Sequence, residues 1–183
     1  ATCLNLLERT WVLSIANSII YSYAGQADPQ QILIHANRVL KEKTSQNMFM
    51  TLLMCSYKKG KLSYVSAGHP ELLQYSAQSR KVVAHKSGGI ALGMVPEIAA
   101  MLSEVSIAFE IGDCIVLYSD GIPEAINERG EQYGMARFKR VLCDCAELQT
   151  AEAIKNDIIA DVKMFTGKAL QAADITLVVV RRV

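Results

Sequence analysis

Residues 112–121 of the chain read GDCIVLYSDG and are followed by IPEA. The apolar and aromatic run from Ile115 to Tyr118 predicts a strand buried on both faces, and the polar residues after it predict a tight turn. Asp120 therefore ends a core strand, and Gly121 permits either a positive φ or the close approach of another group. A carboxylate on such a rigid support suits a metal ligand or a catalytic acid. A turn that uses Asp and Gly only for their backbone preferences explains the same residues equally well.

The composition predicts one folded domain. The chain has 183 residues, of which 51% are hydrophobic and 20% charged. We therefore expect a single domain over residues 1–183 with one sizeable core and little disorder. The formal net charge of +1 gives no electrostatic reason to expect a nucleic-acid partner or an acidic membrane. The sequence shows neither a membrane span nor a signal peptide, so we expect a cytoplasmic location.

The cysteines do not indicate a disulfide framework or a zinc site. They form an odd set without paired metal spacing, at Cys3, Cys55, Cys114, Cys143 and Cys145. Cys55 and Cys114 fall in strongly apolar runs, which predicts reduced, buried thiols. Cys143 and Cys145 are one residue apart, closer than the two-residue spacing of a structural zinc half-site, so ordinary packing near a helix end explains them better.

Apolar residues at three- and four-residue steps predict four helices. The first spans Leu4 to Tyr23 and opens the chain without a cap or lead-in, which suggests a fragment boundary. The second starts at Asp28, an N-cap acid that is followed by a first-turn proline. A third follows Gly134, and Thr150 caps the fourth.

Runs of apolar residues with turn signals between them predict antiparallel strands. Strands are expected at residues 48–57, 61–67, 80–85, 101–109, 115–118 and 175–180. The segment Gly68-His69-Pro70 interrupts the second of these, and Glu71 to Tyr75 is expected to resume it. The glycine-rich segment at residues 87–93 lacks the spacing of a phosphate-binding or dinucleotide-binding motif, so we expect it to shape the backbone. The element order predicts an α+β domain with its helices segregated from its strands.

Six motifs in a consistent order resemble one family. They read FMTLL at residues 49–53, VSAGHP at 65–70, GD at 112–113, YSDGIPEA at 118–125, GEQYG at 130–134 and DITLVV at 174–179. Together they resemble the bacterial branch of the metal-dependent protein serine/threonine phosphatases, the type 2C-like domain of sporulation stage II and sigma-regulator phosphatases. The resemblance covers nearly the whole chain.

The resemblance implies a fold and a metal site. It implies two packed antiparallel sheets flanked by helix pairs, here lacking the first strands, with two Mn²⁺ or Mg²⁺ ions at one end. Hard divalent cations prefer carboxylate oxygens and retained waters, and a metal pair can supply a bridging hydroxide at neutral pH. By this resemblance Asp120 is a metal ligand.

Two ligand positions of the family are missing or substituted. The segment Gly-Asp-x-x-Gly, which carries the metal-bridging acid before the first long helix, does not occur in this sequence. At the last ligand position stands Ala173, and Asp174 is its neighbour. Asp174 is a weaker candidate ligand, because strand alternation would point it away from the side of Ala173. His69 stands where eukaryotic relatives have an acid linked to a third metal, although a plain turn residue explains it better.

These observations leave two hypotheses. The first is dephosphorylation of a phosphoserine or phosphothreonine protein, of the anti-anti-sigma type that controls a sigma factor, with this chain as given inactive. The second is a degenerate domain that acts by protein binding. A nucleophile strand of the haloacid dehalogenase kind fits poorly. Such enzymes place their nucleophilic Asp two residues before a second Asp, and Tyr118 stands at that position here. Uncovered strand edges would also favour self-association into a homodimer.

Overall fold

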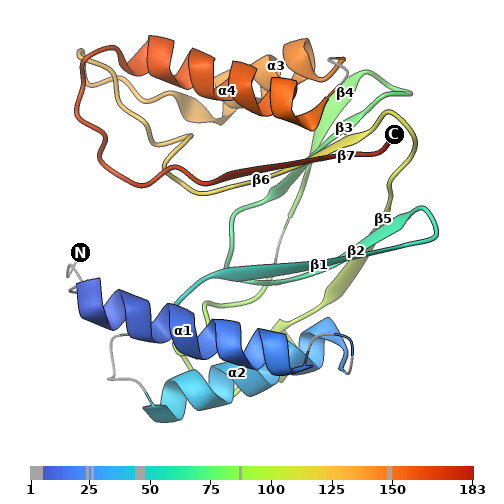
Figure 1. The fold of residues 1–183 in the computed structure, drawn as a ribbon, viewed down its shortest axis with the longest axis vertical. Coiled ribbons are helices and arrows are strands. Elements are labelled where there is room, and N and C mark those ends of the chain that lie inside the picture. The colour runs from blue at the N-terminus through green and yellow to red at the C-terminus, as the bar shows by residue number, and fades with distance from the viewer. Residues whose placement is uncertain (1–5, 24, 26, 44–47, 87, 148–149) are drawn as a thin grey trace. The chain divides into compact units, whose positions relative to one another are not determined.

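The computed structural model describes residues 6–23, 25, 27–43, 48–86, 88–147 and 150–183, with the backbone alone for residues 6–12. The chain divides into two compact units. Unit 1 comprises Ala1–His69 and Ser87–Ala108, and unit 2 comprises Pro70–Lys86 and Phe109–Val183. Each unit holds one antiparallel sheet and one pair of helices (Figure 1). The predicted α+β class with two antiparallel sheets and four helices is confirmed.

Unit 1 is built on helices α1 (Leu6–Tyr23) and α2 (Pro29–Lys43) and on a three-stranded sheet. Its strands are β1 (Leu52–Lys58), β2 (Lys61–Ala67) and β5 (Glu104–Ala108), in the order β1-β2-β5. A short 3₁₀ turn, η1 (Ala99–Met101), precedes β5. The predicted cap of α2 is confirmed, because Asp28 Oδ1 accepts a hydrogen bond from Gln30 N at 3.1 Å.

Among the described residues, helix α2 contributes three of the eight buried residues in the core cluster of unit 1. Leu33, Ala36 and Leu40 are at most 1% exposed and cluster with buried residues of β2 and of the loop at residues 90–102. Asn37 lies in this core and holds that loop. Its amide nitrogen donates to the carbonyl oxygens of Val95 and Pro96 at 3.1 and 3.0 Å, and its Oδ1 accepts from Gly93 N at 2.8 Å. One buried side chain thus shapes the end of the glycine-rich segment.

Unit 2 carries a four-stranded sheet in the order β4-β3-β6-β7. Its strands are β3 (Leu72–Ser76), β4 (Lys81–His85), β6 (Cys114–Tyr118) and β7 (Leu177–Arg181), and its helices are α3 (Gly134–Cys145) and α4 (Ala151–Thr166). Strand β6 is central, since Val116 is opposite Leu73 of β3 and Val179 of β7. The predicted burial of this strand is confirmed, because four of its five residues are at most 4% exposed.

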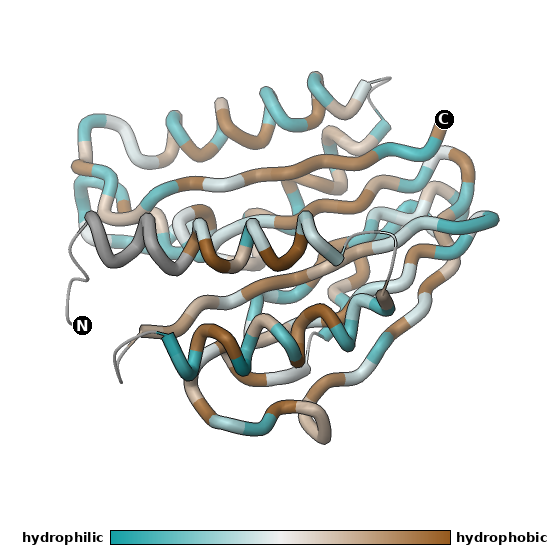
Figure 2. The backbone as a smooth tube through the Cα atoms, turned by 60° about the horizontal axis from the view of Figure 1, so that its bottom comes forward, coloured by the Kyte–Doolittle hydropathy of each residue, from teal (hydrophilic) through white to brown (hydrophobic). Residues whose placement is uncertain are grey.

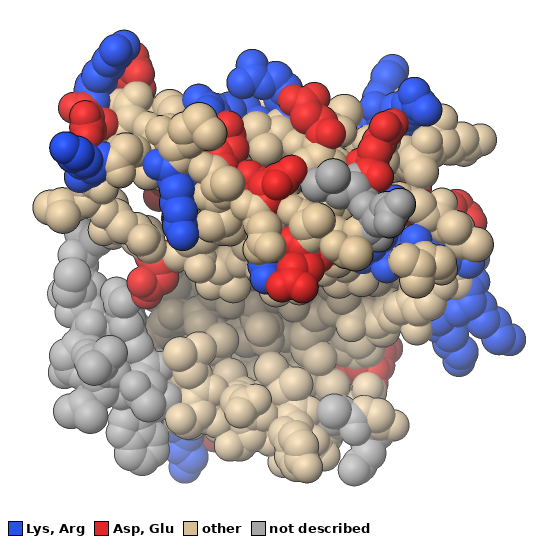
Figure 3. Space-filling model, turned by 45° about the horizontal axis from the view of Figure 1, so that its top comes forward, with Lys and Arg blue, Asp and Glu red and all other residues tan. Residues whose placement is uncertain are grey.

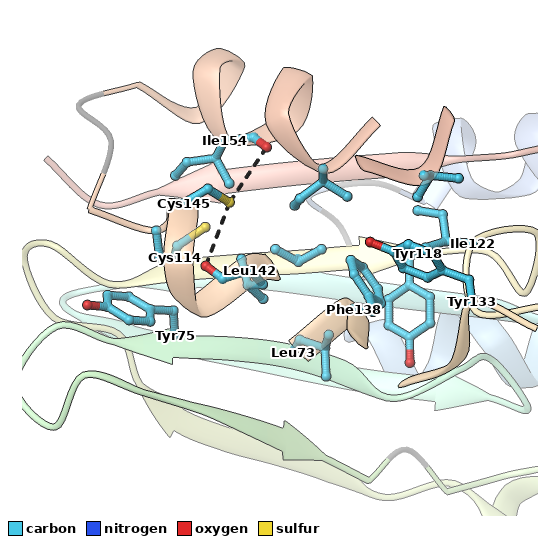
Figure 4. Packing of buried hydrophobic residues seen from close by; sticks show 14 residues of the cluster. Leu73, Tyr75, Cys114, Tyr118, Ile122, Tyr133, Phe138, Leu142, Cys145 and Ile154 are labelled. Carbon is cyan, nitrogen blue, oxygen red and sulfur yellow. Dashed lines mark hydrogen bonds between the residues drawn. The ribbon is translucent and has the colours of Figure 1, made fainter. Parts of the chain in front are cut away.

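The core of unit 2 lies where the sheet packs on α3 and α4. Tyr118 and Phe138 meet edge to face with ring centroids 4.9 Å apart (Figure 4). Figure 4 also shows Cys145 between the carbonyl groups of Leu142 and Ile154. Burial raises the pKa of the Cys145 thiol to about 11 and that of Cys114 to about 12, so both thiols stay protonated at neutral pH.

Helix α4 has the amphipathic pattern from which the sequence predicted it. Hydrophobic and hydrophilic residues alternate along it (Figure 2), and Ile154, Ile158 and Val162 are at most 1% exposed. The predicted cap is confirmed, because Thr150 Oγ1 accepts a hydrogen bond from Ala153 N at 3.1 Å. None of the helices in the described residues is long and apolar enough to cross a membrane.

The structure corrects two expectations. Residues 71–75 do not resume β2, since β3 pairs with β4 and β6 in the other sheet. Antiparallel patterning tells which residues form strands, but the sheet to which a strand belongs depends on long-range pairing. Cys55 is exposed although it lies in an apolar run, and so are the residues that follow it in β1 as far as Lys58. Cys3 lies outside the described residues.

Strand ends also differ from the prediction. The run at residues 48–57 forms β1 only from Leu52, and Met50 makes an isolated bridge to Leu92. The run at residues 101–109 begins in η1 before β5, and the last strand starts at Leu177 and not at residue 175. Backbone pairing, which apolar content does not encode, sets these boundaries.

Candidate functional site

The site is built on the turn that follows β6. Ser119 N donates to Thr176 O at 3.0 Å, and Ile122 N donates back to Ser119 O at 3.2 Å. Glu124 N then donates to Asp120 O at 2.9 Å. The turn is therefore held by its backbone at three points. The residue between them, Asp120, is exposed to solvent.

A second segment lies directly against this turn. Ser119 Oγ donates to Asp174 O at 3.0 Å and accepts from Thr176 N at 2.9 Å, so one hydroxyl links the two segments twice. A Cβ on Gly121 would lie 2.4 Å from Asp174 O. Glycine is thus required here for close approach and not for a positive φ. The structure brings Asp120 and Asp174 onto adjacent segments at one end of the central strand.

The strand on which the alternation at Asp174 depends begins only at Leu177, so residues 173–176 lie outside it. Strand alternation therefore does not decide which way Asp174 points, and its part in the site stays a prediction. Ala173 and Asp174 are both exposed, and Gln171 Nε2 donates to Ala173 O at 2.7 Å. Both residues therefore belong to a loop that lies beside the acidic turn.

Tyr118 supports the turn from inside the core. Burial raises its pKa to about 12, with smaller contributions from the negative charges of Glu71 and Asp120. Its hydroxyl donates to Met135 Sδ at 3.4 Å. Tyr118 therefore keeps its proton at neutral pH and acts as a packing residue, not as a nucleophile or base.

The chain beyond the turn is fastened to α3. Tyr133 N donates to Ala125 O at 2.8 Å, and Gly134 N donates to Pro123 O at 2.9 Å. These bonds anchor residues 122–125 to the start of α3. The segment that follows Asp120 is therefore as firmly held as the turn itself.

A charged cluster joins α3 to α4 behind this segment. Arg137 makes a two-pronged ion pair with Asp161, with both N···O distances at 2.9 Å, and Tyr133 Oη donates to Asp161 at 2.7 Å. The guanidinium also packs over the rings of Tyr133 and Phe165, 5.2 and 4.9 Å from their centroids. Hydrogen bonding from Arg137 lowers the pKa of the Asp161 carboxyl. These contacts fit a structural clamp between the helices.

His69 belongs to unit 1, apart from the unit that holds the two acids. It lies in the turn after β2 and is half-buried, and its backbone N donates to Ser66 Oγ at 3.2 Å. The described contacts of His69 thus agree with the turn role. Its part in a metal site stays a prediction.

The donor set does not by itself fit a metal pair. Among the described residues, no group of three or more His, Cys, Asp or Glu side chains is arranged to hold a metal ion. Asp120 and Asp174 provide two carboxylates, whereas hard divalent cations take six or more oxygen ligands, several of them charged in a dinuclear centre. We therefore derive no chemical step through a metal from these residues.

The structure also shows a pocket that the sequence reasoning missed. It has a volume of about 540 Å³ and lies between the end of α4, the loop at residues 169–175 and the segment from Gly121 to Gln132. Gly121 and Ala173, the chain neighbours of the two acids, both line it. Its other lining residues are mostly small or apolar and far apart in the sequence, so no local motif could have revealed it.

Comparison with family models gives one match. The model described as "Stage II sporulation protein E (SpoIIE)" matches residues 12–183. Among curated proteins, the phosphoserine phosphatase RsbU of Bacillus subtilis is 30% identical over 159 residues, which cover 84% of this chain and 45% of RsbU. The chain thus spans less than half the length of this relative.

Solved structures share the fold at low identity. The SiaA-PP2C domain of Pseudomonas aeruginosa matches with a TM-score of 0.76 and 20% identity, over 96% of this chain and 68% of that one. The RsbU and RsbW domains of Rv1364c from Mycobacterium tuberculosis match with a TM-score of 0.77 and 22% identity, over 96% of this chain and 48% of that one. At these identities the structures show the common fold alone.

Proposed function

Since the chain belongs to the stage II sporulation protein E (SpoIIE) family, we propose that it is part of a phosphatase that removes phosphate from a phosphoserine or phosphothreonine protein. The relative RsbU, a phosphoserine phosphatase, supports this activity. By the resemblance of the motifs, the substrate is a signalling protein of the anti-anti-sigma type, and the reaction controls a sigma factor in the cytoplasm.

One observation carries the proposal. The turn at Ser119–Gly121 and the loop at Ala173–Asp174 are locked together at the end of the central strand, through the Ser119 hydroxyl and the close approach that Gly121 allows. Phosphoryl transfer requires mainly positioning and charge stabilisation. A rigid pair of segments with exposed carboxylates provides a scaffold for both.

We assign Asp120 as a metal ligand and Asp174 as a weaker candidate for Mn²⁺ or Mg²⁺, with His69 a third candidate. Such ions neutralise phosphoryl oxygens and activate water. A dinuclear centre needs more carboxylates than these two. The described residues support Asp120 in three ways. A buried strand precedes it, three backbone hydrogen bonds hold the turn around it, and the segment after it is anchored to the start of α3.

The test is phosphate release by the full-length protein. The protein is stripped with a chelator, Mn²⁺ is added back, and hydrolysis of a phosphoserine peptide is followed. We expect activity that depends on Mn²⁺ and falls by roughly 100-fold or more in Asp120→Ala, since even groups that only orient metal ligands contribute 10- to 100-fold. Equal activity of the two proteins would overturn the assignment of Asp120.

A specific observation favours a second candidate, a domain that keeps the fold for protein binding without catalysis. Ala173 lies beside the acidic turn at the position where the family has a ligand, and it offers no oxygen side chain. If this lost ligand is the cause of inactivity, Ala173→Asp in the full-length protein should gain Mn²⁺ affinity. Calorimetry that shows the same tight binding with and without the change would exclude this alternative.

A further inference from the structure

Hydrogen bonds join the segments that form the walls of the pocket beside the acidic turn. Ser119 Oγ fastens the turn to Asp174 and Thr176. Glu128 Oε1 accepts a hydrogen bond from Lys168 N at 2.9 Å, which fastens the loop after α4 to the segment after the turn. Walls that are joined in this way reduce the ordering that a ligand must impose on binding.

The segment opposite α4 has its own internal order. Asn127 Oδ1 accepts hydrogen bonds from Arg129 N at 2.9 Å and Glu131 N at 3.0 Å, and Asn127 Nδ2 donates to Glu131 Oε2 at 2.7 Å. An isolated antiparallel bridge joins Ile126 to Gln132. Both of these residues line the pocket. This wall is therefore a folded loop of fixed shape.

The lining suits an apolar side chain with a peptide backbone beside it. Ile159, Val162 and Ile175 contribute apolar surface, whereas Gln132 and Gln171 carry amide groups that can both donate and accept hydrogen bonds. The volume of about 540 Å³ falls within the range of small-ligand pockets, which are lined mostly by apolar groups with a few polar ones.

The rim exposes apolar side chains to water. Leu170 is 95% exposed and Ile126 is 38% exposed, and both line the pocket. The face of unit 2 around α3 and α4 otherwise carries acidic and basic side chains interspersed (Figure 3). Exposed apolar residues that converge on a concave site, within a surface of mixed charge, are typical of a binding site.

The position of the pocket beside the acidic turn indicates which ligand it would bind. Gly121 follows Asp120, and Ala173 precedes Asp174, so the wall begins one residue from each acid, about 3.8 Å along the chain. An extended peptide advances about 3.3 to 3.6 Å per residue. A phosphorylated residue held at the acidic turn would therefore place a side chain one to three positions away over the pocket.

From this arrangement we infer that the pocket is a docking site for the substrate polypeptide, which inserts an apolar side chain lying within three residues of the phosphorylated serine or threonine. This inference rests on the proposed function, because the phosphorylated residue is placed at the acidic turn. The pocket selects substrates by the residues beside the phosphate.

The test measures binding without turnover. Fluorescent nine-residue peptides carry a central phosphonate analogue of phosphoserine, which cannot be hydrolysed, and either alanine at all other positions or one leucine within three positions of the analogue. Binding to the full-length protein with Mg²⁺ present is followed by fluorescence anisotropy and by amide shifts of the pocket residues. We expect at least one leucine peptide to bind about 10-fold or more tightly than the all-alanine peptide, since its leucine side chain leaves water for an apolar pocket.

Two variants test whether the leucine preference arises at the pocket. Ala172 lines the pocket in an exposed loop, so Ala172→Phe should fill the pocket and remove the leucine preference. Ala160 is exposed on α4 outside the pocket, so Ala160→Phe is the matched control and should keep the preference. Unchanged thermal unfolding shows that each variant is folded.

Three results would overturn the inference: no leucine preference at any position, a preference that survives Ala172→Phe, or equal binding of the unphosphorylated leucine peptide. The outcomes separate the two proposals. Phosphate release without a leucine preference refutes only the docking site. A phosphate-dependent leucine preference without any phosphate release refutes the proposed catalysis and leaves the docking site in place.

Discussion

The two ends of strand β6 each carry an aspartate, but the structure treats them in opposite ways. Asp113, just before the strand, is 3% exposed, and its carboxylate accepts hydrogen bonds from Gln74 Nε2, Ala77 N and Glu110 N, each at 2.9 Å. Asp120, two residues after the strand, is exposed, and its backbone makes the contacts that hold the turn. The Asp113 carboxylate is hydrogen-bonded within the fold, whereas Asp120 is exposed to solvent.

The comparison shows how a carboxylate becomes available for chemistry. Three donors around a buried acid leave it little capacity to bind anything else, so its role is to join β3, the turn at residues 77–79 and the turn before β6. At the other end, Ser119 and Gly121 perform the joining, which frees the acid between them. The contacts that support the turn thus come from Ser119 and Gly121, while the Asp120 side chain stays exposed.

The largest expected effect on stability lies at the Asp113 end. Asp113→Ala removes the acceptor from three donors, one of them the amide of the buried Gln74, and should lower the free energy of unfolding by about 3–5 kcal/mol in urea titrations. Asp144→Ala, on the exposed side of α3, is the matched control and should stay within about 0.5 kcal/mol of the parent. A loss at Asp113 as small as that of the control would show that the buried network does not stabilise the unit.

A smaller loss of stability is expected when a side chain disturbs the close approach at Gly121. Gly121→Ala would place a Cβ 2.4 Å from Asp174 O, so the two segments must separate, with a loss of about 1–3 kcal/mol. Gly88→Ala is the matched control, because the nearest atom to its added Cβ is 3.9 Å away. Amide shifts of Thr176 should move only in the Gly121 variant. Equal stability of the two variants would contradict the tight packing of the turn.

Removing the Ser119 hydroxyl should cost about 1 kcal/mol. Ser119→Ala loses the bonds to Asp174 O and Thr176 N, but both partners are near solvent and can bind water. Thermal unfolding measures the loss, and faster hydrogen exchange at Thr176 should accompany it. Unchanged exchange at Thr176 would mean that the hydroxyl does not link the segments in solution.

The smallest expected effect is a pH dependence at the Asp113 end. His85 Nε2 lies 2.8 Å from Gln74 Oε1, and burial lowers the pKa of His85. The unfolded chain, whose His pKa is about 6.5, binds the proton first, so stability should fall as the pH drops below that value towards the folded pKa. Unfolding of the parent and of His85→Gln between pH 7.5 and 5 checks this. The same pH slope in both proteins would exclude His85 as its source.

Local patterns in the sequence predicted most of the helices and strands. The burial of β6 followed from its four apolar residues, and the caps at Asp28 and Thr150 followed from their side-chain chemistry. The sheet that β3 joins could not be predicted, because both sheets accept a short apolar strand and only long-range pairing distinguishes them.

The candidate site was only partly predictable, for a similar reason. The Asp-Gly pair after β6 identified the turn, but the same pattern of Gly and Asp before β6 gave no sign that Asp113 would be buried and fully bonded. That difference depends on Gln74 and Ala77, more than thirty residues away in the chain. The pocket beside the turn depends on α4 and on the loop before β7, so it too required the fold.

The most direct test of the contrast between the two ends of β6 is phosphate release per folded molecule by full-length Asp120→Ala, measured with Mn²⁺ beside the parent and Asp144→Ala. We expect Asp120→Ala to unfold within about 0.5 kcal/mol of the parent and to lose roughly 100-fold or more of the activity, while Asp144→Ala keeps both. Full activity in Asp120→Ala, or a loss of activity that merely follows a drop in stability, would show that Asp120 is not the aspartate that serves the reaction.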